Sequence, residues 1–131
     1  MAGERILIVD DNPTNLKLAR ILLGGEGYDV RTAESAVEAL GAIREFCPRL
    51  ILMDVQLPGT DGLTLTRRLK ADPATRDIVV VALTACAMLG DEEKALAAGC
   101  AGYLTKPVDT RTLPAFVASH LSPGREEAGG A

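Results

Sequence analysis

Five short apolar runs alternate along this chain with five segments whose apolar residues recur at helical spacing. The runs at 6–9, 50–53 and 78–83 are continuous, which is typical of strands buried on both faces of a parallel sheet. Residues 28–33 alternate and are more polar, as in an edge strand, and 102–105 form a short fifth run. We therefore expect an α/β fold with a doubly wound, five-stranded parallel sheet in the order 2-1-3-4-5, a (βα)5 architecture with right-handed crossovers.

Start and stop residues place the helices between these strands. Asn12 before Pro13 indicates an N-cap with proline at the first helical position, and Ser35 with Glu38 forms a capping box. We expect helices over 13–23, 36–47, 63–71, 90–98 and 113–121. The second helix carries an apolar stripe made of Ala36, Leu40, Ile43 and Cys47. The fourth helix has few large apolar residues, so we expect it to be loosely held.

Composition bounds the function classes. A chain of 131 residues, 47% of them hydrophobic, suits one globular domain, which we place at 1–121 and follow with a flexible polar tail at 122–131. The formal net charge of −4 argues against direct binding of DNA through phosphate contacts. The three cysteines lack paired spacing, which favours a reduced, cytoplasmic protein. We find neither a signal peptide nor an apolar run long enough to span a membrane.

Polar residues follow four of the five strands. Asp10 and Asp11 follow the first, Asp54 the third, Thr84 the fourth and Lys106 the fifth. In a parallel sheet these strand ends lie at one edge, where open α/β folds place their ligands. Each residue also has a purely structural interpretation, because such residues cap helices and form turns. Their occurrence together at four strand ends of one chain favours a site.

The chemistry of this site follows from its charges. Three carboxylates at close range cannot all stay ionised without compensation, and Mg²⁺ prefers such oxygen ligands while keeping several waters. With the metal bound, Asp54 could attack phosphorus and form an aspartyl phosphate. Lys106 and Thr84 could then each address an oxygen of the phosphoryl group.

These residues resemble a known family, the receiver domains of two-component response regulators. The resemblance covers about residues 4–121 and implies the flavodoxin-like or CheY-like fold. The motifs that carry it are Asp10-Asp11-Asn12, Met53-Asp54-Val55-Gln56-Leu57-Pro58-Gly59, Asp61-Gly62, Leu83-Thr84-Ala85 and Tyr103-Leu104-Thr105-Lys106-Pro107. The run at 84–88 with Gly90-Asp91 and Ala98-Gly99-Cys100 is more similar to the stand-alone, DivK-like members.

The resemblance implies a role for each matching residue. Asp54 would accept the phosphoryl group, and Asp11, Asp54 and the backbone carbonyl of Gln56 would bind Mg²⁺, with Asp10 acting mostly through water. Lys106 would contact the phosphoryl group, and the Lys106-Pro107 peptide would be cis. Thr84 and Tyr103 would be the switch residues, moving toward the phosphate and inward behind it.

The resemblance also implies partners. A histidine kinase or histidine phosphotransfer protein would donate the phosphoryl group, and the surface of the fourth helix, fifth strand and fifth helix would bind a downstream protein effector. The protein would be a monomer or a weak phosphorylation-dependent dimer, and would catalyse only its own phosphorylation and dephosphorylation.

Two alternatives stay open at this point. One is a phosphate sink or relay that binds no effector. The other is an Mg²⁺-dependent aspartate phosphatase, although Gln56 stands where such enzymes usually carry a second acid, two residues after the nucleophile.

Overall fold

A single parallel sheet organises the chain. The computed structural model describes residues 3–57, 60–84, 91–105 and 110–121. The sheet has the order β2-β1-β3-β6-β7, with every neighbouring pair parallel. Its strands are β1 (Arg5–Val9), β2 (Asp29–Ala33), β3 (Leu50–Asp54), β6 (Val79–Thr84) and β7 (Gly102–Thr105). The predicted order 2-1-3-4-5 is therefore confirmed, since β6 and β7 are the fourth and fifth strands of this sheet.

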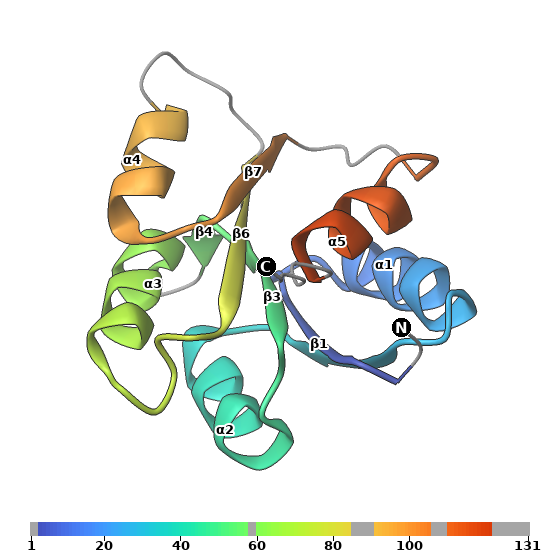
Figure 1. Cartoon of the computed structure of the whole chain (residues 1–131), viewed down its shortest axis with the longest axis horizontal. Helices are drawn as coiled ribbons and strands as arrows, with labels where there is room; N and C mark the ends of the chain where they lie inside the picture. Colours follow the sequence, from blue (N-terminus) through green and yellow to red (C-terminus); the bar gives the residue numbers. More distant parts are fainter. Residues whose placement is uncertain (1–2, 58–59, 85–90, 106–109, 122–131) are drawn as a thin grey trace, which may run out of the picture.

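Helices cover both faces of the sheet (Figure 1). They are α1 (Pro13–Gly25), α2 (Ala36–Phe46), α3 (Gly62–Ala71), α4 (Asp91–Ala98) and α5 (Leu113–Leu121). One core cluster joins alternate residues of the central strands to α1 and α5, and a second joins the other residues to α2, α3 and α4. In β1, for example, Ile6 and Ile8 belong to the first cluster, and Leu7 and Val9 to the second. This alternation is the pleat of a strand buried on both sides.

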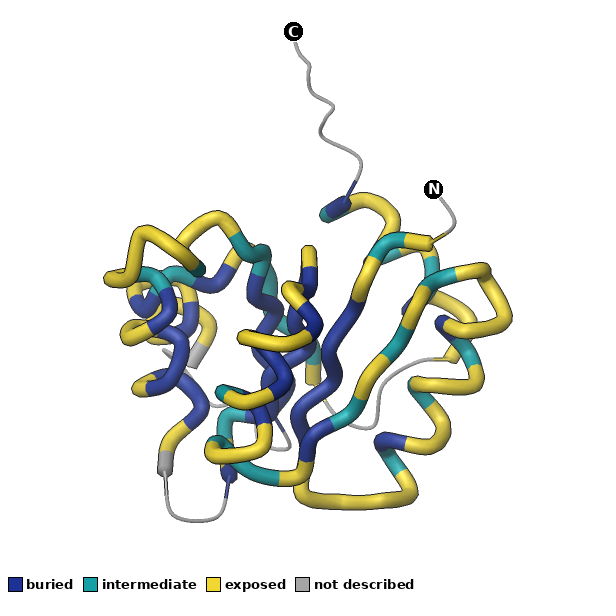
Figure 2. Tube along the Cα trace, turned by 90° about the horizontal axis from the view of Figure 1, so that it is seen from below, coloured by how far each residue is buried: buried dark blue, intermediate teal, exposed yellow. Residues whose placement is uncertain are grey.

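The central strands form the most buried part of the molecule, and exposed residues follow the outer helix surfaces (Figure 2). All five residues of β3 are buried, whereas the edge strand β2 is largely exposed or half-buried. The difference agrees with the continuous and alternating patterns of their sequences. None of the helices that the structure describes is long and apolar enough to cross a membrane.

A short hairpin follows β3 and was absent from the sequence-based prediction. Its strands are β4 (Gln56–Leu57) and β5 (Thr60–Asp61), which pair antiparallel with Gln56 opposite Asp61. The hairpin returns the chain to the end of β3, where Asp61 caps α3 by accepting a hydrogen bond from the Leu63 N–H at 2.8 Å. Two-residue strands leave no periodic pattern, so sequence alone could not indicate them.

The helix starts agree with the predicted caps. The Asn12 side chain accepts a hydrogen bond from the Thr14 N–H at 2.9 Å, with Pro13 at the first position of α1. Ser35 accepts from the Glu38 N–H at 3.2 Å. The Glu38 carboxylate reaches back to the Glu34 N–H at 2.8 Å, one residue before the expected partner. The bonds from Thr14 and Glu38 satisfy donors that the helices leave free, and the bond from Glu34 fastens the residue before the cap of α2.

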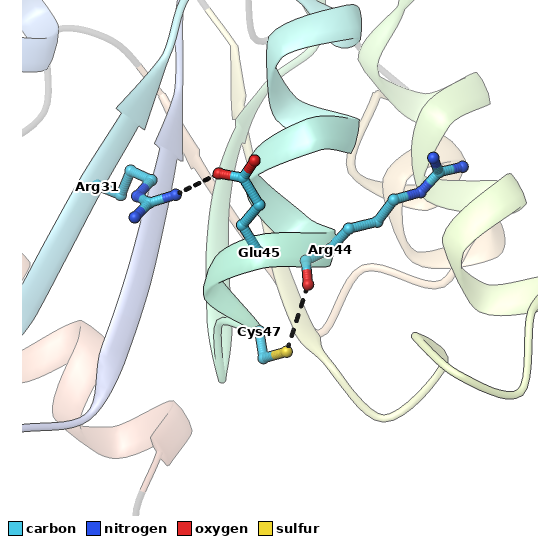
Figure 3. A network of polar contacts seen from close by, with 4 residues as sticks. All are labelled: Arg31, Arg44, Glu45 and Cys47. Atoms are coloured by element: carbon cyan, nitrogen blue, oxygen red, sulfur yellow. Dashed lines mark hydrogen bonds and ion pairs between the residues drawn. The ribbon is translucent and has the colours of Figure 1, made fainter.

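The C-terminal end of α2 corrects one prediction. Cys47 was expected on the buried stripe, but it is exposed and ends the helix in the left-handed conformation, with φ 52°. Its thiol lies 3.8 Å from the Arg44 carbonyl, and nearby Arg31 pairs with Glu45 at 3.3 Å (Figure 3). The buried residues of α2 are Ala39, Ala42, Ile43 and Phe46. Cys47 therefore lies outside the buried face of α2, because the helix ends at Phe46.

The thin apolar face predicted for α4 is present. Ala95 and Ala98 are its buried residues among those described, and Leu96 is 48% exposed. Alanines bury little apolar area, so this helix gains less from packing than α1 or α3 do. At the helix end, Cys100 is buried and burial raises the pKa of its thiol.

Replacing Ser35 by alanine should lower the free energy of unfolding by about 1 kcal/mol, because the Glu38 N–H loses its partner at the start of α2. Urea denaturation followed by circular dichroism measures this change. Ser119→Ala is the matched control, since the Ser119 hydroxyl bonds a carbonyl within α5 and caps no helix start. Equal stability of Ser35→Ala and the unmodified protein would contradict the capping role.

Candidate metal and phosphoryl site

Asp10 stands where β1 ends and is almost fully buried, with 1% of its surface exposed. Its N–H donates to the Ala33 carbonyl at 3.1 Å, so the sheet fixes its backbone. Its two carboxylate oxygens accept hydrogen bonds from the Asn12 N–H at 2.9 Å and from the Asn15 side-chain amide at 3.2 Å. Asp10 is therefore a rigid anion at the sheet edge, next to the exposed Asp11.

Asp54 is the last residue of β3 and is 3% exposed. It lies opposite Leu83 in the sheet, and the next N–H, that of Val55, donates to the Leu83 carbonyl at 2.9 Å. One carboxylate oxygen of Asp54 accepts a hydrogen bond from the Gln56 N–H at 3.0 Å. The sheet and the following turn together fix the direction of this carboxylate.

The structure brings Asp10, Asp11 and Asp54 together. One carboxylate oxygen of each lies within 4.8 Å of the others, and two of the three residues are buried. Three carboxylates so close, mostly out of water, repel one another unless a cation compensates. The predicted convergence of the ends of β1 and β3 is therefore confirmed.

The donor set fits Mg²⁺. All available ligand atoms are carboxylate oxygens, which a small hard cation prefers, and three protein ligands leave positions for water or a phosphoryl oxygen. Both Asp10 oxygens already accept hydrogen bonds, so Asp11 and Asp54 are better placed to bind the ion directly. Gln56, the predicted backbone ligand, is exposed on β4, two residues beyond Asp54.

The switch residues predicted on the other two strands lie at different distances from this edge of the sheet. Thr84 is the buried last residue of β6, one position beyond the residue that pairs with Asp54. Tyr103 pairs with Ala82 in the middle of β7, is half-buried, and packs against the core cluster under α2, α3 and α4. Its hydroxyl is buried. The predicted roles of Lys106, and of its peptide with Pro107, fall outside the described residues.

Sequence reasoning missed two residues that support the site. Asn15 holds Asp10 through its amide, and only its place on the first turn of α1, five residues later, could have indicated this. Gly62 lies against the Asp54 backbone, closely enough that a Cβ would collide with the Asp54 carbonyl. The Asp61-Gly62 pair belonged to the motif, but its contact with Asp54 requires the hairpin.

Known proteins share this sequence pattern and this fold. Residues 6–118 match the family described as response regulator receiver domain. The polar-differentiation response regulator DivK of Brucella ovis is 46% identical over 114 residues, which cover 87% of this chain and 90% of that protein.

Solved structures of receiver domains have the same fold as this chain. A CheY-like response regulator receiver domain protein from Methanospirillum hungatei has a TM-score of 0.88 at 31% identity, covering 97% of this chain and all of its own. The BeF3-activated receiver domain of Klebsiella pneumoniae RstA has a TM-score of 0.82 at 30% identity, covering 90% of this chain and 98% of its own.

Proposed function

Because this chain belongs to the response-regulator receiver family, we propose that it is a phosphorylation switch that accepts a phosphoryl group on Asp54 in an Mg²⁺-dependent reaction. The observation that carries the proposal is the gathering of Asp10, Asp11 and Asp54 within 4.8 Å at one sheet edge. Mg²⁺ would supply the charge compensation that lets an anionic carboxylate approach an anionic phosphoryl group.

Each residue has a defined part in this proposal. Asp54 is the nucleophile, because the end of β3 and the Gln56 N–H hold its carboxylate rigidly beside Asp10 and Asp11. Asp11 and the Gln56 carbonyl would complete the protein ligands of the ion, and Asp10 would act mostly through water. Thr84 and Lys106 would bind the transferred group, and the Lys106–Pro107 peptide would be cis, as the family resemblance implies.

The donor would be a histidine kinase or histidine phosphotransfer protein, and the reaction would take place in the cytoplasm. The phosphorylated form would bind a protein effector through α4, β7 and α5. The small packing area of α4 supports this, since an element held by Ala95 and Ala98 costs little to move. Turnover of an external substrate and direct DNA binding form no part of the proposed function.

The switch can be tested by two-dimensional NMR of amide groups, with BeF₃⁻ and Mg²⁺ as a stable mimic of the phosphoryl group. We expect shift changes at residues 54–56 and 84, and also along α4, β7 and α5, because binding shifts a pre-existing equilibrium between two states. Asp54→Asn should show neither the shift changes at the site nor those along α4, β7 and α5. Changes confined to the site, with no phospho-selective partner, would favour a phosphate sink or relay instead.

Adding Mg²⁺ should raise the melting temperature relative to EDTA. An ion that binds only the folded protein stabilises it by about 2.7 kcal/mol at a concentration of about 100 times its Kd. Asp11→Asn should reduce this gain, because one of the three carboxylates is lost. Asp77→Asn, an exposed aspartate outside the cluster, is the control. The same Mg²⁺ response in Asp11→Asn and Asp77→Asn would contradict the assigned metal site.

A further inference from the structure

Gly62, the first residue of α3, lies directly against the peptide that joins Asp54 to Val55. It is buried, and its N–H donates to the Val55 carbonyl at 2.8 Å. A Cβ at this position would be 3.0 Å from both the Asp54 carbonyl carbon and the Val55 Cα, and would overlap the Asp54 carbonyl oxygen. All three neighbours are backbone atoms, which cannot rotate away as a flexible side chain could.

Glycine is needed at position 62 because there is no room for a side chain, and not because the backbone adopts an unusual conformation. The glycines with positive φ among the described residues are Gly3, Gly27 and Gly99, and Gly62 is not one of them. Alanine could therefore adopt the backbone angles of Gly62 without strain. What it could not do is occupy the gap between α3 and the end of β3.

The hairpin after β3 makes this contact part of the site. Gln56 donates its N–H to the Asp54 carboxylate at 3.0 Å and pairs with Asp61, the residue before Gly62. The residues next to Asp54 are thus fastened to the residues at the start of α3, through the pairing of Gln56 with Asp61 and the bond between Gly62 and Val55. A displacement of Gly62 would move the Asp54 carboxylate and the Gln56 peptide together.

Thr66 holds Gly62 from the other side. Its hydroxyl donates to the Gly62 carbonyl at 2.9 Å, and the residue is fully buried with 0% exposure. The start of α3 is therefore fixed by the Asp54–Val55 peptide on one side and by the Thr66 hydroxyl on the other.

We propose that Gly62 is a positioning residue for phosphoryl acceptance, because its missing side chain lets α3 press on the Asp54–Val55 peptide and set the place of the Asp54 carboxylate against Asp10 and Asp11. Thr66 keeps Gly62 in that place. The inference rests on the proposed function of Asp54 as acceptor. Neither residue contacts the reacting atoms; both act through the backbone of Asp54.

Gly62→Ala tests the inference most strongly. Relief of the overlap requires a shift of roughly 1 Å, and misplacement on that scale can lower a rate about 100-fold. We expect the rate of phosphoryl incorporation from acetyl phosphate, at saturating donor and Mg²⁺, to fall about 10- to 100-fold. The donor concentration for half the maximal rate should stay unchanged, and calorimetry should show weaker Mg²⁺ binding. A merely destabilised but folded protein would keep both the rate and the Mg²⁺ affinity.

Thr66→Val is the second variant, because it adds no atom near Asp54 and removes the bond to the Gly62 carbonyl. We expect a loss of about two- to fivefold in the same rate, in keeping with one lost hydrogen bond. The matched controls are Gly41→Ala on α2, where a Cβ would meet no atom within 4 Å beyond its own helix backbone, and Thr64→Val, an exposed change on α3. Both should keep the unmodified rate.

The outcomes are distinct. No adduct on the unmodified protein would overturn the proposed function, and this inference with it. An adduct that forms equally fast, with equal Mg²⁺ affinity, in Gly62→Ala would overturn the inference alone. Should Gly62→Ala fail to fold, as judged by circular dichroism, Thr66→Val decides: a rate equal to that of Thr64→Val overturns the inference, and a slower one supports it.

Discussion

Asp54→Asn should reduce phosphoryl incorporation from acetyl phosphate below detection by intact mass. The amide that replaces the carboxylate carries no negative charge, so it cannot attack phosphorus to form an acyl phosphate. The substitution nearly preserves shape, and the side-chain oxygen can still accept the Gln56 N–H. The fold and the ends of β1 and β3 should therefore stay in place. The loss of phosphoryl incorporation would then result from the missing nucleophile and not from a change in structure.

Asp29→Asn is the matched control for this result. Asp29 is an exposed aspartate at the start of β2, and so lies at the opposite end of the sheet from the three carboxylates. This variant should form the adduct at the unmodified rate. An adduct of equal yield on Asp54→Asn would mean that another carboxylate is the acceptor and would contradict the assignment.

Ile51→Ala should lower the free energy of unfolding by about 2–5 kcal/mol. Ile51 is 0% exposed at the second position of β3, between β1 and β6, and belongs to the core cluster under α2, α3 and α4. Truncation removes buried apolar atoms and leaves a cavity where neighbours on both sides are strands. The sheet cannot collapse into that space without distorting its hydrogen bonds.

Urea denaturation measures this loss, and Ile21→Ala provides the same chemical change on the outer face of α1. Ile21 is 59% exposed, so its truncation should change stability by only about 0.5 kcal/mol. Equal effects of the two truncations would contradict the placement of β3 at the centre of the core. A change in the slope with urea, without a change in midpoint, would point instead to an altered unfolded state.

The central strands were predictable because their burial on both faces appears directly in the sequence. Leu7 and Ile8 point to opposite faces of the sheet, and both are apolar. The sequence of such a strand is therefore a continuous apolar run and does not alternate between apolar and polar residues. Their strand ends could then be placed at one edge by topology alone. That is why Asp54 could be grouped from the sequence with the distant pair Asp10 and Asp11.

Other features depend on contacts that no local pattern encodes. Cys47 continues the helical spacing of Ile43, yet α2 ends before it in a left-handed cap. Asp61-Gly62 belongs to the family motif, but the contact of Gly62 with the Asp54 carbonyl exists only once the hairpin has formed. The roles of Lys106 and Pro107 stay predictions, since both lie outside the described residues.

The most direct test of phosphoryl acceptance is to trap the modified residue chemically. After incubation with acetyl phosphate and Mg²⁺, borohydride reduces an aspartyl phosphate to homoserine, and tandem mass spectrometry of peptides locates the reduced residue. We predict homoserine at position 54 alone, formed with Mg²⁺ and absent with EDTA. Homoserine at position 10 or 11, equal yield without Mg²⁺, or no homoserine at all would contradict a metal-dependent acceptor at Asp54.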